Sequence, residues 1–146
     1  MSDTPFEFWH HHGGVSVPDL DEAIAWWDRT LGFKLERRRE IPSVPCEYAM
    51  VRNGNLHIEI FEVPGAIPPA ENRGYPDEDL RTYGNKHVAF AVADVPAFAE
   101  ELKRRGADIV WVKVFEFGAN IFIRDNAGNL IEFIQQAKPL PEISFL

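Results

Sequence analysis

Three things are scarce in this sequence of 146 residues: cysteine, basic side chains and long apolar runs. The single cysteine, Cys46, excludes an internal disulfide and is typical of a reducing compartment. No apolar run approaches the ~20 residues that a membrane-spanning helix needs, and the first residues lack the basic-then-apolar build of a signal peptide. We therefore expect a cytoplasmic protein with no membrane partner.

Basic residues are outnumbered: 15 Lys and Arg stand against 23 Asp and Glu, a formal net charge of −8. A negative chain repels phosphate backbones, so a nucleic-acid partner is not expected. The densest basic run, Arg37 to Arg39, lies between Glu36 and Glu40 and is typical of a solvated strand end.

Histidine is also rare, but its five residues are grouped. Three are consecutive, and the other two lie in strand-like runs; they are His10, His11, His12, His57 and His87. This grouping raises the question of a metal site, because neutral imidazole is a common metal ligand.

The sequence repeats itself once. The run H-G-G-V-S-V-P-D-L-D-E-A-I from His12 aligns with H-V-A-F-A-V-A-D-V-P-A-F-A from His87, 75 residues later. The run around Glu59 aligns in the same way with the run around Glu132, 73 residues later. A repeat this long is no solenoid unit, so we expect two copies that share one fold.

Each copy is expected to contain a strand, a helix and then three strands. Asp19 and Asp94 stand at N-cap positions, and Gly32 and Gly106 end the two helices. The expected strands are 8–17, 33–39, 47–53, 56–63, one that opens after His87, 109–114, 119–124 and 130–135. The connection from Pro64 to Gly84 contains four prolines and is expected to form no regular element.

Alternation along the strands predicts which side chains share a face of each sheet. Where Val15, Ile58 and Ile131 face the helix, His12, Glu59, His87 and Glu132 all point to the face without a helix. Such residues taken singly are usually solvated, but equivalent positions in a repeat rarely match by accident. Two imidazoles and two carboxylates on this face predict a divalent-metal site.

Several runs carry a resemblance to a known family. They are H-G-G-V-S-V-P-D-L-D-E-A-I-A-W-W, L-G-F, I-E-I-F-E-V-P, K-H-V-A-F-A-V-A-D-V and I-R-D-N-A-G-N-L-I-E-F. Together they resemble the vicinal oxygen chelate superfamily of glyoxalase I, methylmalonyl-CoA epimerase, fosfomycin and bleomycin resistance proteins and extradiol dioxygenases. The resemblance covers residues 8–135, and the family's metal positions fall on His12, Glu59, His87 and Glu132.

The resemblance implies an α+β fold in which two βαβββ modules form a curved, partly open sheet around a central metal cavity, with the helices outside. We expect a single domain over residues 1–146. It comprises module one at about 7–63, a connecting loop at 64–84, module two at about 85–136 and a C-terminal tail at 137–146. The tail is apolar enough to pack across a homodimer, which we expect.

Four protein ligands on a six-coordinate ion would leave two positions for a small substrate with adjacent oxygens. The ion, whether Zn, Ni, Co, Mn or Fe, would stabilise negative charge while a base removes a proton next to a carbonyl. As the resemblance suggests, Glu59 or Glu132 would be that catalytic base. The first hypothesis is therefore a metal-dependent isomerase, epimerase or lyase.

Two alternatives remain. An Fe(II) extradiol dioxygenase needs only two His and one carboxylate, so a fourth ligand at Glu59 disfavours it. A metal-free drug-binding protein would bury two carboxylates without a cation, which costs several kcal/mol each. Near the four ligands, His10 and His57 are possible neighbours, and His11 is expected to be incidental.

Overall fold

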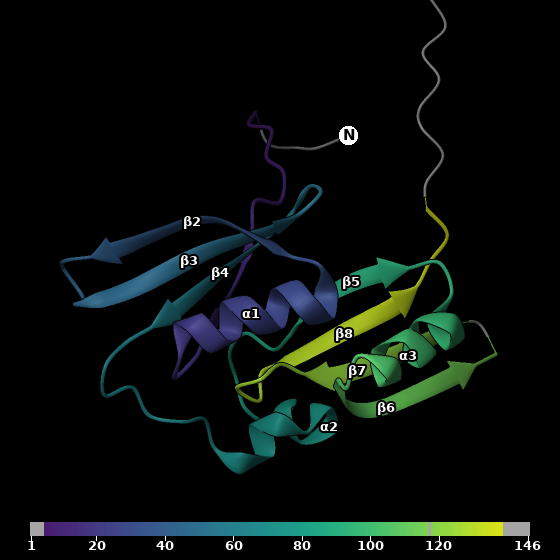
Figure 1. Ribbon diagram of the computed structural model, residues 1–146. Coiled ribbons are helices and arrows are strands. Elements are labelled where there is room, and N and C mark those ends of the chain that lie inside the picture. The colour runs from purple at the N-terminus through teal and green to yellow at the C-terminus, as the bar shows by residue number, and fades with distance from the viewer. Residues whose placement is uncertain (1–4, 117, 139–146) are drawn as a thin grey trace, which may run out of the picture. The chain divides into compact units, whose positions relative to one another are not determined.

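The computed structural model describes residues 5–116 and 118–138, and these divide into two compact units. Unit 1 spans residues 1–66 and unit 2 spans residues 67–146. Each unit is a four-stranded mixed sheet with a helix packed on one face, and neither sheet closes on itself (Figure 1). The α+β fold class expected from the sequence is confirmed.

Unit 1 runs through β1 (Gly13–Ser16), α1 (Leu20–Leu31), β2 (Lys34–Ile41), β3 (Cys46–Asn53) and β4 (Leu56–Glu62). The strands lie in the order β1-β4-β3-β2, with β1 parallel to β4 and the other pairs antiparallel. Helix α1 packs on this sheet through Leu20, Trp27 and Leu31, each 9% exposed or less.

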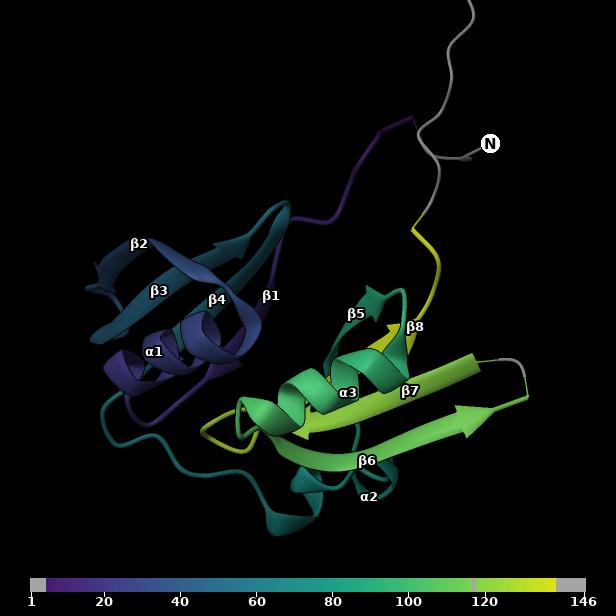
Figure 2. The ribbon, with the colours of Figure 1, turned by 45° about the vertical axis from the view of Figure 1, so that its right-hand side comes forward.

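Unit 2 repeats this plan after two short helical segments, η1 (Glu71–Gly74) and α2 (Pro76–Asp79). It continues through β5 (Val88–Val92), α3 (Val95–Arg104), β6 (Asp108–Phe115), β7 (Gly118–Arg124) and β8 (Leu130–Gln135). The strand order is β5-β8-β7-β6, with β5 parallel to β8 (Figure 2). The ring of Phe98 on α3 meets Phe133 of β8, so this face of the sheet is the covered one.

The helix starts follow the repeat closely. Asp19 accepts a hydrogen bond from the Glu22 N–H, and Asp94 accepts one from the Ala97 N–H, as expected for N-caps. The strand that ends each module supplies a second acceptor: Glu62 binds the Leu20 N–H at 2.9 Å, and Gln135 binds the Val95 N–H. The last strand of each module therefore holds the start of its helix.

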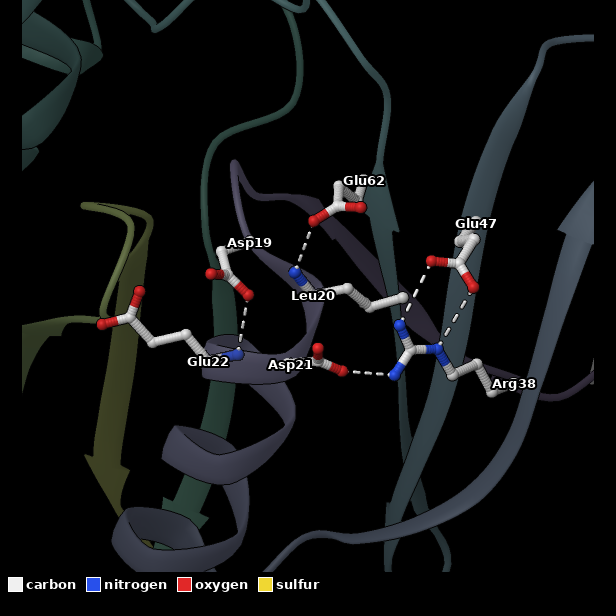
Figure 3. A network of polar contacts seen from close by, with 7 residues as sticks. All are labelled: Asp19, Leu20, Asp21, Glu22, Arg38, Glu47 and Glu62. Carbon is white, nitrogen blue, oxygen red and sulfur yellow. Dashed lines mark hydrogen bonds and ion pairs between the residues drawn. The ribbon is translucent and has the colours of Figure 1, made fainter.

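A polar network on the helix side of unit 1 shows which side chains of β2 point toward α1 (Figure 3). Arg38 donates to Asp21 at the start of α1 and to Glu47 on β3, at 2.5 and 3.1 Å. These hydrogen bonds, first that of Glu47, raise the pKa of Arg38 further above its ordinary value. Because Arg38 points to the helix side, its neighbours Arg37 and Arg39 point to the opposite face.

Two expectations about local structure were wrong. The first strand begins at Gly13 rather than near Phe8, because β4 begins at Leu56 and offers no partner to residues before His11. The registers of β4 and β8 place Leu56 on the face of Ile58 and Leu130 on the face of Glu132, as alternation predicts, although Leu56 is 45% exposed and Leu130 is buried.

The second wrong expectation was that the connection 64–84 contains no element, since η1 and α2 lie within it. Pro76 fixes φ at the first position of α2, and ion pairs from Asp79 to Arg73 and Lys86 hold the segment. The end of the expected tail, residues 139–146, lies outside the described residues, as does any packing of it across a dimer. No described helix is long and apolar enough to span a membrane.

Candidate metal centre

One histidine–glutamate pair lies on the open face of the unit 1 sheet. Gly14 of β1 is the register partner of Glu59 on β4, and His12 comes two residues before Gly14, hence on the same face. The His12 Nε2 atom lies 3.5 Å from Glu59 Oε1. The two side chains are 33% and 22% exposed, so the pair is part-buried and still reachable from solvent.

A second pair lies at the equivalent place in unit 2. Ala89 of β5 is the register partner of Glu132 on β8, and His87 comes two residues before Ala89. The His87 Nε2 atom lies 3.2 Å from Glu132 Oε1, and the side chains are 22% and 15% exposed. The ring of Phe122 meets His87 edge-on at 4.8 Å. The repeat is therefore kept at the level of strand register.

The structure thus joins the four expected ligands as two pairs, one in each unit. Within neither unit do three His, Cys, Asp or Glu side chains of the described residues gather as a possible metal site. The joining of the two pairs in one site stays a prediction.

The spacing within each pair suits neighbouring ligands of one ion. Metal–nitrogen and metal–oxygen bonds of about 2.1 Å place adjacent donors roughly 3.0 Å apart in an octahedron and roughly 3.4 Å apart in a tetrahedron. The observed 3.2 Å in unit 2 lies within this range, and the 3.5 Å in unit 1 lies just above it. One imidazole nitrogen and one carboxylate oxygen per pair form a donor set for borderline divalent metals.

Around the unit 1 pair lie two further histidines. The Nδ1 atoms of His11 and His12 are 2.6 Å apart, so His11 occupies the nitrogen of His12 that points away from Glu59. His57 contacts Glu36 at 3.4 Å and stacks beside His11. Metal-bound histidines commonly bind a neighbour through their second nitrogen. The sequence interpretation expected His11 to be incidental and did not foresee its contact with His12.

Around the unit 2 pair the neighbours are amide and indole groups. The Asn120 amide donates to Glu132 Oε2 at 2.9 Å, and the Trp111 indole donates to Asn120 Oδ1 at 3.1 Å. The sequence interpretation named neither residue. The sequence did contain a signal for Asn120. Ile121 and Ile123 are buried on the helix side of the sheet, so strand alternation places Asn120 on the opposite face, with Glu132.

The open faces also carry cations. Across the unit 1 sheet, Arg37 is the register partner of Met50, which is the partner of Glu59. Arg39 occupies the next position on this face, and Lys113 is its equivalent in unit 2. Among the described residues, neither Arg37 nor Arg39 forms a salt bridge with a carboxylate. Strand spacing puts Arg37 about 10 Å from Glu59, measured between backbones.

The chain is similar to known proteins in family, sequence and fold. The family model of the glyoxalase/bleomycin resistance protein/dioxygenase superfamily matches residues 11–124. An ethylmalonyl-CoA/methylmalonyl-CoA epimerase of Cereibacter sphaeroides is 26% identical over 131 residues, which cover 86% of this chain and 96% of the epimerase.

Two longer relatives match as well. A 2-epi-5-epi-valiolone epimerase of Actinomyces is 30% identical over 64% of this chain and 56% of its own length. A lactoylglutathione lyase of Arabidopsis thaliana is 28% identical over 90% of this chain and 45% of its own. The chain thus spans about half the length of these two relatives.

Among solved structures, a glyoxalase family protein of Enterococcus faecalis superposes with a TM-score of 0.72 at 20% identity. The superposition covers 87% of this chain and 97% of that protein. A glyoxalase I mutant of Zea mays superposes with a TM-score of 0.67 at 25% identity, over 88% of this chain and 45% of its own. These likenesses support the fold.

Proposed function

The chain belongs to the glyoxalase/bleomycin resistance protein/dioxygenase superfamily, whose model matches most of it, and on this basis we propose that it is a divalent-metal-dependent lyase, isomerase or epimerase. The relatives named above as lyase and epimerases support this class of chemistry. The observation that carries the proposal is the repetition of one His–Glu pair, at one strand register and with ligand-like spacing, in both units.

The two pairs, His12 with Glu59 and His87 with Glu132, would hold the ion. When bound, a divalent ion supplies Lewis-acid stabilisation of negative charge that develops on a carbonyl oxygen. The protein's own part is proton transfer, for which Glu59 and Glu132 are the candidate bases on this face. The proposal includes a small substrate with adjacent oxygens.

The cations on the same face support a further property of that substrate. Arg37 and Arg39 are exposed, face the side of Glu59 and lack a carboxylate partner among the described residues. In a chain of net charge −8, such cations attract an anionic group. We therefore expect the substrate to carry a carboxylate or phosphate in addition to its chelating oxygens.

The structure weakens one argument against a metal-free binding protein. The sequence interpretation assumed two buried carboxylates without partners, but Glu59 and Glu132 are part-buried and each contacts a histidine. The cost of desolvation is therefore smaller than for a fully buried carboxylate. The homodimer and the cytoplasmic location remain predictions of the proposal.

Isotope exchange tests the reaction class. Metal-replete protein is incubated in D₂O, without oxygen, with lactoylglutathione, methylmalonyl-CoA or 2-epi-5-epi-valiolone, each of which has a hydrogen on a carbon next to a carbonyl. We expect deuterium at that carbon in at least one compound, and none with the Glu59→Gln, Glu132→Gln double variant. Absence of exchange in all three contradicts proton abstraction from such substrates. Oxygen consumption with catechol and Fe(II) would instead favour the dioxygenase.

A further inference from the structure

The two carboxylates of the proposed metal site differ in how they are held. Glu132 is bound at both oxygens: Oε1 lies 3.2 Å from His87 Nε2, and Oε2 accepts a hydrogen bond of 2.9 Å from Asn120. For Glu59, the part of the chain that the structure describes supplies one such contact, from His12 to Oε1.

The hydrogen bonds of Asn120 have a fixed direction. The Trp111 indole N–H can only donate, so the amide oxygen of Asn120 must face it and the amide NH₂ must face Glu132. An NH₂ group that donates to Oε2 fixes the orientation of the Glu132 carboxylate and leaves Oε1 as the oxygen on the side of His87. Trp111 itself is held from its ring face by the Lys113 ammonium, 3.6 Å from the ring centroid. All of these groups are on the open face of β6, β7 and β8.

Unit 1 lacks this arrangement at the equivalent positions. Asn120 is the register partner of Ile134, two residues beyond Glu132; the corresponding residue in unit 1 is Tyr48, the partner of Phe61. The ring of Tyr48 packs against Phe61. The two halves of the repeat therefore share their histidine–glutamate pair but differ in the group beside the carboxylate.

We propose that Asn120 is a positioning residue, oriented by Trp111, that holds Glu132 as a fixed metal ligand through Oε1. This inference rests on the proposed function. Because Oε2 is engaged by Asn120, Glu132 offers one oxygen to the ion in one orientation, which lowers the ordering cost of metal binding. Glu59 is held through Oε1 alone by the described residues, so the two carboxylates are not interchangeable. Trp111 is linked to Glu132 through Asn120 by two hydrogen bonds, so its fluorescence should respond when Glu132 binds a metal.

Metal affinity in the absence of substrate tests this role. The binding of Ni²⁺ or Zn²⁺ to the full chain is measured by calorimetry for wild type, Glu132→Gln, Asn120→Leu and Tyr48→Phe. Loss of a group that orients a metal ligand typically weakens binding 10- to 100-fold. We expect a loss of about this size for Asn120→Leu and no change for Tyr48→Phe, the matched substitution in the other unit.

Tryptophan fluorescence supplies a second, independent signal. The difference between the emission of wild type and of Trp111→Phe isolates Trp111, and we expect it to change on metal addition in wild type but not in Asn120→Leu. Trp111→Phe also frees the Asn120 amide to rotate and should weaken metal binding several-fold. Folding of each variant is checked by circular dichroism. If Asn120→Leu does not fold, the metal affinity of Trp111→Phe still tests the proposal.

The outcomes separate the two proposals. If wild type binds no divalent metal, the proposed function fails. If wild type binds metal and Glu132→Gln weakens binding, while Asn120→Leu and Trp111→Phe bind like wild type, the positioning role fails and the metal site stands. Equal losses in Asn120→Leu and Tyr48→Phe would also overturn the positioning role, because the two carboxylates would then be held alike.

Discussion

Replacement of Asp79 by asparagine tests how the segment before His87 is held. The Asp79 side chain is 3% exposed, accepts a hydrogen bond of 2.8 Å from Arg73 Nε and lies 3.4 Å from Lys86 Nζ. Lys86 also donates to the backbone carbonyls of Asp79 and Thr82. Since His87 directly follows Lys86, these contacts connect α2 to the residues that lead into β5.

The magnitude follows from the two charged contacts. A hydrogen bond to a charged group contributes about 1.5–3 kcal/mol, and charge-assisted pairs are roughly twice as strong as neutral ones. The Arg73 side chain is 36% exposed, so solvent screening lowers the free energy that its ion pair with Asp79 contributes. We therefore expect Asp79→Asn to lower the free energy of unfolding by about 1–3 kcal/mol, or the Tm by roughly 3–10 °C.

The effect should depend on pH with a definite sign. Burial raises the pKa of Asp79, but the hydrogen bonds from Arg73 and Lys86 outweigh it and hold the pKa below its ordinary value of 3.8. A lowered pKa in the folded state gives stabilisation that is complete above the ordinary pKa and is lost as the pH falls through the folded pKa. The difference between wild type and Asp79→Asn should thus be constant near neutrality and shrink below about pH 4.

Urea denaturation between pH 3 and pH 7 measures both quantities, with Asp77→Asn as the control. Asp77 is exposed on the same short helix, so its substitution should change the free energy of unfolding by less than about 0.5 kcal/mol. Equal stability of the two variants would refute the assigned role of Asp79. So would a difference from wild type that grows as the pH falls.

Three further predictions concern unit 1. Glu62→Ala removes the acceptor of the Leu20 N–H and should lower the free energy of unfolding by about 1 kcal/mol in urea; an unchanged value would show that this bond contributes nothing. Gly54→Ala should lower the free energy of unfolding by about 1–2 kcal/mol, because Gly54 has φ +59°. A Cβ at this position meets nothing within 4 Å, so the loss would come from the backbone conformation alone, and an unchanged free energy would contradict this argument. The Arg37→Gln, Arg39→Gln double variant should raise KM for an anionic substrate about tenfold with unchanged metal affinity; an unchanged KM would remove these cations from substrate binding.

Local signals in the sequence predicted the helices well. Asp19 and Asp94 cap the two helices as expected, and Gly32 and Gly106 have the positive φ that ends a helix. Such signals are read within one or two turns of chain and need no tertiary context. The alternation of side chains likewise placed each histidine on the face of its glutamate, since β1 with β4 and β5 with β8 are regular parallel pairs.

Features that depend on pairing between strands were missed. The first strand is shorter than predicted because its length is set by the start of β4, so residues 8–12 lie before it. Asn120 and Trp111 are brought to Glu132 by the register of three strands, which one sequence does not reveal. Helix α2 has only four residues, too few to show a helical periodicity in the sequence, and Asp79 on it contacts Arg73.

Metal stoichiometry tests the central claim most directly. Calorimetric titration of Ni²⁺ or Zn²⁺ is compared for wild type, His12→Ala and His87→Ala, which remove one imidazole from each unit. We predict one tightly bound ion per wild-type chain and a large loss of affinity in both variants, because each pair supplies half of one ligand set. Two ions per chain, each lost in only one variant, would show two separate sites. Unchanged binding in either variant would contradict the four-ligand account.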